Sequence, residues 1–191
     1  AELTAAGARR RDLTDLVARG ELRRPRAGWY STLDTDEPRF RAVRVGGSLT
    51  GASALAEMGA WMLHPPPRIE VAVVRGSARL RTDTGVRIHW GSEGRLSPRG
   101  IVGLGEALVR LVLDHDLEMS VPALDWALHT GRLDRIDFER FVLRLPVAAR
   151  CIREWVDSAS ESVLESVARV RLLRRGWAVA SQVRVGDFGA I

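Results

Sequence analysis

The chain has 191 residues, 46% hydrophobic and 28% charged, which suits one sizeable globular core or two small domains. Its formal net charge is +5, and all 29 cationic side chains are arginines. The absence of lysine excludes a Walker A phosphate loop and Schiff-base chemistry, and the single cysteine excludes an internal disulfide.

The first thirty residues predict two helices and a hairpin. A short helix over about residues 1–6 precedes a second helix over about residues 9–19, which a glycine follows in the capping position. Leu13, Leu16 and Val17 give the second helix an apolar stripe at i, i+3 and i+4. The segment GELRRPRAGWYS then has the turn residues of a hairpin.

The next segment predicts a linker, a helix and two strands. Residues 34–41 are polar and irregular, which indicates a linker, and an alanine-rich helix is predicted over residues 49–61. The run RIEVAVV predicts a strand, and residues 86–90 predict a second one. The turn-rich segment between these strands suggests that they pair as a hairpin.

Helical periodicity dominates from Gly103 onward. After a first helix, a second is predicted over residues 121–130, and a third begins at an Asp-x-x-Asp capping arrangement and covers residues 134–142. A closing helix is predicted over residues 160–174, and the alternation over residues 178–185 predicts a strand. We therefore expect an α+β fold.

Seven arginines lie between residues 9 and 26, on the second predicted helix and on the hairpin. Helices followed by a basic hairpin are typical of a winged helix-turn-helix, whose second helix enters the major groove of DNA. Arg11 is best placed to reach a guanine edge, and Thr14 to reach a base or a phosphate. The remaining candidates would contact phosphates: Arg9 and Arg10 at the helix entrance, and Arg23, Arg24 and Arg26 on the wing.

A second interpretation of the basic helix stays open. Arg11 and Asp15, and Asp15 and Arg19, are spaced at i, i+4. Side chains at this spacing form ion pairs on solvated helix faces, and Asp15 would repel phosphate. The residue pattern alone is therefore compatible either with DNA binding or with a solvated face.

The stretch GARRRDLTDLVARGELRRPRAGWYSTL resembles the N-terminal winged-helix domain of AbiEi-like antitoxins. Gly20, Leu22, Arg23, Gly28 and Tyr30 match the family pattern, and VGGSLTGASALAEMGAWML resembles the opening helix of the family's next domain. The resemblance covers about 140 residues. It implies a transcriptional autoregulator of a toxin–antitoxin or defence operon, which binds double-stranded DNA as a homodimer and has a cognate toxin as a partner.

The closing stretch SASESVLESVARVRLLRRGWAVASQVRV resembles the start of a restriction-endonuclease-like domain related to very-short-patch-repair endonucleases, as found in actinobacterial proteins. Ser162, Glu165, Arg169, Gly176 and Gln182 carry this resemblance. It implies a catalytic role for Glu165 at a magnesium site, with partner carboxylates beyond residue 191. Since magnesium needs more than one carboxylate, we expect no metal or other cofactor in the chain as given. Alternatively, Glu165 forms an i, i+4 ion pair with Arg169.

Together these patterns predict three regions: a winged helix-turn-helix over residues 1–33, an AbiEi-like α/β domain over residues 34–148, and the start of an endonuclease-like domain over residues 149–191. The leading hypothesis is a DNA-binding autoregulator or antitoxin-like protein, not an enzyme as given. The alternative is a magnesium-dependent DNA endonuclease whose catalytic half lies beyond residue 191. A third hypothesis is an interaction role, in which the domain over about residues 36–146 neutralises a toxin. No signal peptide or membrane span is evident, so we expect a cytoplasmic protein.

Overall fold

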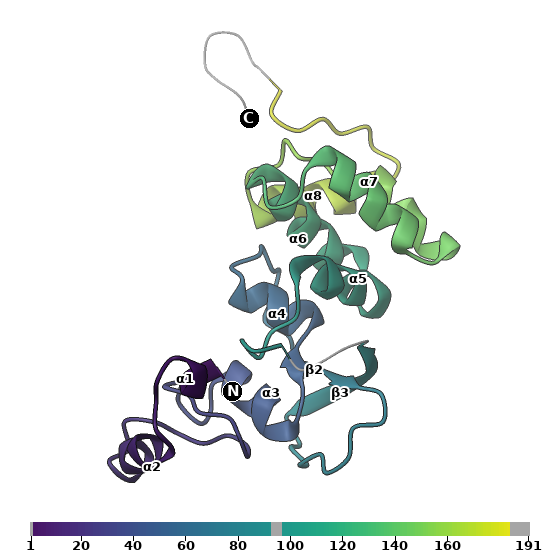
Figure 1. Ribbon diagram of the computed structural model, residues 1–191. Helices are drawn as coiled ribbons and strands as arrows, with labels where there is room; N and C mark the ends of the chain where they lie inside the picture. Colours follow the sequence, from purple (N-terminus) through teal and green to yellow (C-terminus); the bar gives the residue numbers. More distant parts are fainter. Residues whose placement is uncertain (1, 93–96, 184–191) are drawn as a thin grey trace. The chain divides into compact units, whose positions relative to one another are not determined.

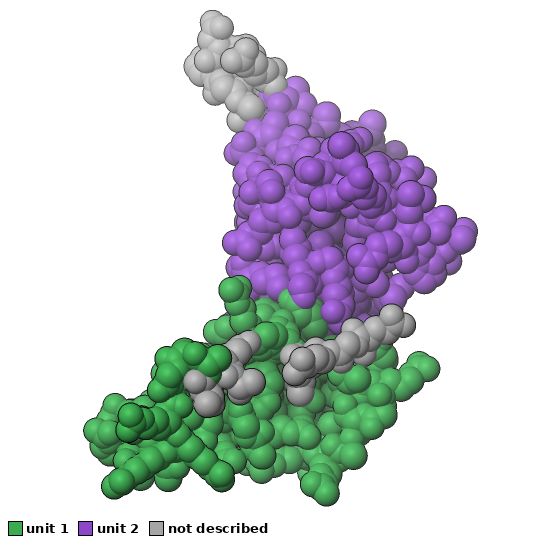
Figure 2. Space-filling view, viewed as in Figure 1, with its two compact units in different colours: residues 1–49, 68–102 green, residues 50–67, 103–191 purple. Residues whose placement is uncertain are grey.

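The computed structural model describes residues 2–92 and 97–183, which form two compact units (Figures 1 and 2). Unit 1 comprises residues 1–49 and 68–102, and unit 2 comprises residues 50–67 and 103–191. The predicted α+β class is confirmed, because the described residues form eight α-helices, a 3-10 helix and a three-stranded sheet. None of the described helices combines the length and apolar character needed to cross a membrane.

Unit 1 contains three helices and the sheet. Its elements are α1 (Glu2–Ala5), α2 (Arg10–Ala18), α3 (Pro38–Val45), β1 (Ser48–Leu49), β2 (Ile69–Val74) and β3 (Val86–Ser92). In the sheet β2 lies between β1 and β3, and β1 runs antiparallel to β2 with Leu49 opposite Val71. The predicted winged-helix region lies wholly in unit 1, whereas the predicted central domain is shared between the two units.

Strands β2 and β3 are parallel, so the predicted hairpin between them is wrong. Ile69 pairs with Val86, and the register continues along both strands. Residues 75–85, which we call the crossover segment, bring the chain back to the start of β2. The Arg81 N–H donates to the Val45 carbonyl (3.1 Å), and the Ile69 N–H donates to the Gly85 carbonyl (2.9 Å). These bonds hold the crossover segment in the position that lets β3 run parallel to β2. The turn residues of the segment do not predict this position.

Helix α3 occupies part of the predicted linker, which is therefore wrong from Pro38 onward. Proline fits the first turn of a helix because its missing N–H has no partner there. Phe40, Val43 and Val45 are buried, and α3 packs against β1 and β2. The spacing of these apolar residues was obscured by the charged residues between them. Leu49 lies in β1 rather than in the predicted alanine-rich helix, which begins two residues later, at Gly51.

Unit 2 is helical in its described part. Its elements are α4 (Gly51–Glu57), α5 (Leu104–Asp114), α6 (Leu117–His129), α7 (Arg135–Arg144), the 3-10 helix η1 (Val147–Glu154) and α8 (Val163–Leu173). Helix α4 packs against α5, and α6 packs against α8. The predicted cap of α7 is confirmed: the Asp134 carboxylate accepts a hydrogen bond from the Asp137 N–H (2.7 Å).

The strand predicted over residues 178–185 is not formed where the structure describes the chain. Residues 178–183 have no regular secondary structure, and residues 184 and 185 lie outside the described residues. Gln182 has a φ of 54°, in the left-handed region, which is incompatible with a continuous strand. Alternating apolar residues do not form a strand without a neighbouring strand to supply hydrogen bonds, and no described strand pairs with residues 178–183.

Candidate nucleic-acid interface

Helix α2 presents its predicted DNA-binding residues to solvent. Arg9 is its N-cap, and Arg9, Arg10, Arg11 and Thr14 are all exposed. The Thr14 hydroxyl donates to the Arg10 carbonyl (2.9 Å), which leaves its oxygen lone pairs able to accept further bonds. The N-terminal turn of α2 thus gathers three guanidinium groups where helix N–H groups already favour an anion.

The opposite face of α2 fixes this orientation. Leu13 is buried, and Leu16 and Val17 are half-buried, which confirms the predicted apolar stripe. The Asp12 carboxylate accepts from the Arg9 N–H (3.3 Å) at the start of the helix. Gly20 follows the C-cap with a φ of 76°, a conformation in which a glycine is favoured.

The ion pairs of the solvated-face interpretation are not formed. Within the described residues, Asp15 makes no salt bridge to Arg11 or to Arg19. Arg19 pairs instead with Glu21 (3.4 Å), and both side chains of this pair are largely exposed. Arg11 therefore has no side-chain partner along its helix that would compete for an external anion.

The predicted wing is a tight hairpin held by a single bridge. The Arg23 N–H donates to the Ser31 carbonyl (2.8 Å), and the Ser31 N–H donates back to the Arg23 carbonyl (2.9 Å). The Trp29 N–H closes the turn on the Arg26 carbonyl (3.0 Å). Gly28 has a φ of 81°, so a glycine suits this turn.

The three wing arginines have different surroundings, which the sequence did not distinguish. Arg23 forms a salt bridge with Asp34 (2.5 Å). Arg26 is half-buried and donates to the Ala78 carbonyl in the crossover segment (3.5 Å). Arg24 is exposed, with its guanidinium 5.9 Å from the centre of the Tyr30 ring. Arg24 is consequently the wing arginine best able to contact a phosphate.

Charge differs sharply between the two units. Unit 1 contains 17 arginines and 10 acidic residues, a formal net charge of +7, whereas unit 2 contains 12 arginines and 14 acidic residues, a net charge of −2. The overall charge of +5 conceals this difference. The excess of arginine therefore lies in the unit that carries α2 and the hairpin.

Glu165, the candidate catalytic residue, lies in the first turn of helix α8, which Ser162 caps. Its N–H donates to the Ser162 hydroxyl oxygen (3.2 Å), and its carboxylate accepts from the Glu161 N–H (2.9 Å) and from the Gln182 amide (3.2 Å). The Glu161 N–H, followed by Gln182 and Ser162, holds the Glu165 pKa below its ordinary value. Among the described residues, Glu165 belongs to no cluster of three metal-binding side chains. This environment fits the first turn of a capped helix.

The alternative pair between Glu165 and Arg169 is wrong, because Arg169 points into unit 2. Its guanidinium donates to the Asp125 carboxylate (2.5 Å) and to the Trp155 carbonyl, and the Arg169 and Asp125 side chains are 6% and 0% exposed. The Asp157 N–H also donates to Asp125 (2.8 Å). Sequence reasoning missed this pair, since its members are 44 residues apart.

No known protein family matches the chain, and no curated protein does. Solved structures that resemble it include the crystal structure of the RV2827C protein from Mycobacterium tuberculosis. The two share 20% sequence identity over 97% of this chain and 78% of that protein, with a TM-score of 0.42.

Proposed function

We propose that this chain is a DNA-binding protein in which helix α2 and the following hairpin contact double-stranded DNA. The observation that carries the proposal is the exposed arginine cluster on α2 and the hairpin, within a unit of net charge +7. A winged helix-turn-helix is the arrangement that best fits this order of elements. The finer assignment is an autoregulator or antitoxin-like protein of a toxin–antitoxin or defence system, supported by the resemblance of residues 7–33 to AbiEi-like antitoxins.

The residues divide by the chemistry that each offers. Arg11 is the second residue of α2 and is the candidate for bidentate contact with a guanine edge. Arg9, Arg10 and Arg24 are candidates for phosphate contacts, which set affinity for all sequences alike. A homodimer would place two copies of α2 on half-sites about one helical turn apart.

The salt dependence of duplex binding tests the proposal. Arg24→Ala should lower the slope of log K against log [salt] by about 0.9, since one phosphate contact is lost. Arg11→Ala should reduce the preference for a selected sequence over a random duplex by a factor corresponding to about 1–3 kcal/mol. The control is Arg140→Ala, which removes one arginine from unit 2, where that side chain is 72% exposed.

The outcomes are distinct. If Arg140→Ala changes binding as much as Arg24→Ala does, attraction by total charge explains the result and the proposed surface is wrong. If the chain binds no duplex even at low salt, the function itself is wrong. Co-purification with the product of a neighbouring gene would identify a toxin partner, and the DNA-binding role requires no metal.

A further inference from the structure

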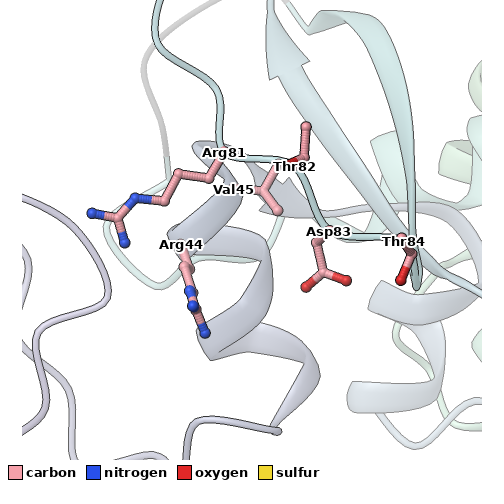
Figure 3. Close-up of a pocket in the computed structure, with 6 residues that line it drawn as sticks. All are labelled: Arg44, Val45, Arg81, Thr82, Asp83 and Thr84. Atoms are coloured by element: carbon pink, nitrogen blue, oxygen red, sulfur yellow. The ribbon is translucent and has the colours of Figure 1, made fainter.

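A polar cleft lies beside the end of α3, outside the surface formed by α2 and the hairpin (Figure 3). It has a volume of about 320 Å³. Arg44 and Val45 line it from α3, and residues 81–84 line it from the crossover segment. The backbone hydrogen bond between the Arg81 N–H and the Val45 carbonyl holds the two sides together. All of these residues belong to unit 1.

Positive charge dominates this cleft. Its one acidic lining residue, Asp83, is held by Arg41, with Nε–Oδ2 at 3.0 Å and Nη2–Oδ1 at 2.5 Å, and it also accepts from the Gly85 N–H (3.0 Å). The negative charge of Asp83 is offset mainly by Arg41, which does not line the cleft, and to a smaller extent by the nearby charge of Arg44. Arg44 and Arg81 remain as the exposed charges at its mouth.

The two arginines keep most of their hydrogen-bond donors. Arg44 donates to no other described residue, and Arg81 uses Nη1 on the Pro25 carbonyl (3.3 Å). A guanidinium has five N–H donors in a planar fork that matches the oxygens of a phosphate group. Thr82 and Thr84 also line the cleft, from the crossover segment (Figure 3).

The cleft is physically tied to the hairpin. The Arg81 guanidinium donates to the carbonyl of Pro25 in the hairpin turn, and the Arg26 guanidinium donates to the carbonyl of Ala78 in the crossover segment. These reciprocal contacts place the hairpin and the crossover segment side by side. A DNA backbone that follows the hairpin would therefore pass the cleft.

We propose that the cleft between Arg44 and Arg81 binds a phosphate group of the DNA backbone. The inference rests on the proposed function, and it extends the interface from one continuous stretch of sequence to the end of α3 and the crossover segment. Arg44 and Arg81 bind the phosphate oxygens through their guanidinium N–H groups.

The first arm of the test measures duplex binding of the double variant Arg44→Gln/Arg81→Gln over a range of salt concentrations. The slope of log K against log [salt] should fall by about 0.9, and affinity should fall equally for all sequences. The matched control is Arg140→Gln in unit 2, which should leave both unchanged. Because both substituted arginines are exposed, the circular dichroism spectrum should stay as in the original chain. Loss of the Arg81 hydrogen bond to the Pro25 carbonyl should lower the thermal midpoint by no more than about 2–4 °C.

The second arm titrates inorganic phosphate into the ¹⁵N-labelled chain without DNA and follows the arginine Nε–Hε signals. The single variants Arg44→Gln and Arg81→Gln assign the two signals, and both should shift together and saturate. If the chain binds duplex but the double variant keeps the original slope, the backbone contact is overturned while the proposed function stands. If the chain binds no duplex, the proposed function falls. In that case, if the Arg44 and Arg81 Nε–Hε signals shift with phosphate, the cleft binds free phosphate and not DNA. If these signals do not shift, the cleft is not an anion site.

Discussion

The buried pair between Asp125 and Arg169 gives the strongest prediction about the stability of unit 2. It joins α6 to α8 and to the turn that contains Trp155 and Asp157. Arg169→Met removes the cation and leaves a carboxylate that is 0% exposed without its charged partner. Breaking a buried pair in this way costs about 3–5 kcal/mol. For a chain of this length, that cost corresponds to a fall in Tm of about 6–20 °C.

The size of the effect should depend on pH. Burial raises the pKa of Asp125 from 3.8 to about 6, although Ser166, Arg169 and the Asp157 N–H all act to lower it. The folded chain therefore binds a proton more tightly than the unfolded chain, and this group's contribution to stability declines as pH rises from about 4 to about 6. Below this window Asp125 is neutral in both states. Arg169→Met should accordingly cost less at pH 4.5 than at pH 7.5.

Urea unfolding followed by tryptophan fluorescence measures this cost. Trp61, Trp126, Trp155 and Trp177, four of the six tryptophans, lie in unit 2, so the signal reports mainly on that unit. The double variant Asp125→Leu/Arg169→Met should recover part of the loss, because an apolar pair leaves no buried charge. A loss below about 1 kcal/mol for Arg169→Met, or a double variant whose loss equals the sum of the two single losses, would refute the reasoning.

Three further predictions concern backbone packing, capping and acid sensitivity. Gly47→Ala should destabilise the chain by about 1–3 kcal/mol, since the added Cβ would lie 2.4 Å from the Ala72 carbonyl oxygen. The control is Gly105→Ala at the second residue of α5, where the added Cβ would lie 3.7 Å from its nearest neighbour. This control should stabilise the chain by about 0.5–1 kcal/mol in the same urea titration. Ser162→Ala should cost about 1 kcal/mol through loss of the α8 cap. Added magnesium should leave the Tm of the original chain unchanged; a rise in Tm that is absent from Glu165→Gln would instead favour a metal site at Glu165. The hydrogen bond from Arg41 lowers the pKa of Asp83 below 3.8, so its contribution is present above that pH and is lost as pH falls further; thermal melts from pH 2 to pH 6 should show a smaller acid-induced loss of Tm for Asp83→Asn.

The sequence predicted helices better than strand pairing. Helix α2 and the start of α7 were located correctly, because an apolar stripe and a cap are local signals that a few residues carry. The pairing of β2 with β3 was not, since the direction of a strand depends on where the crossover segment docks. That docking rests on bonds to Val45 and Arg41, residues more than 30 positions away.

In the candidate interface, too, the sequence predicted the local features but not the tertiary contacts. The spacing of Leu13, Leu16 and Val17 was enough to predict which face of α2 carries the arginines. It was not enough to predict that Asp34 engages Arg23, or that the Ala78 carbonyl accepts from Arg26. Local periodicity reports which side chains are exposed, whereas the partners of an exposed arginine depend on tertiary contacts.

More than half of the net positive charge of unit 1 lies outside residues 1–33, the predicted winged-helix region. Residues 1–33 contain 7 arginines and 4 acidic residues, a net charge of +3, although the whole of unit 1 carries +7. The difference comes from α3 and from the segment over residues 68–102, which were predicted to lie in a separate domain. Because counterion release depends on how many cations reach phosphates, a scan confined to the stretch from Arg9 to Arg26 would recover only part of the salt slope. Substituting Arg44 and Arg81 should lower the slope further, by about 0.9.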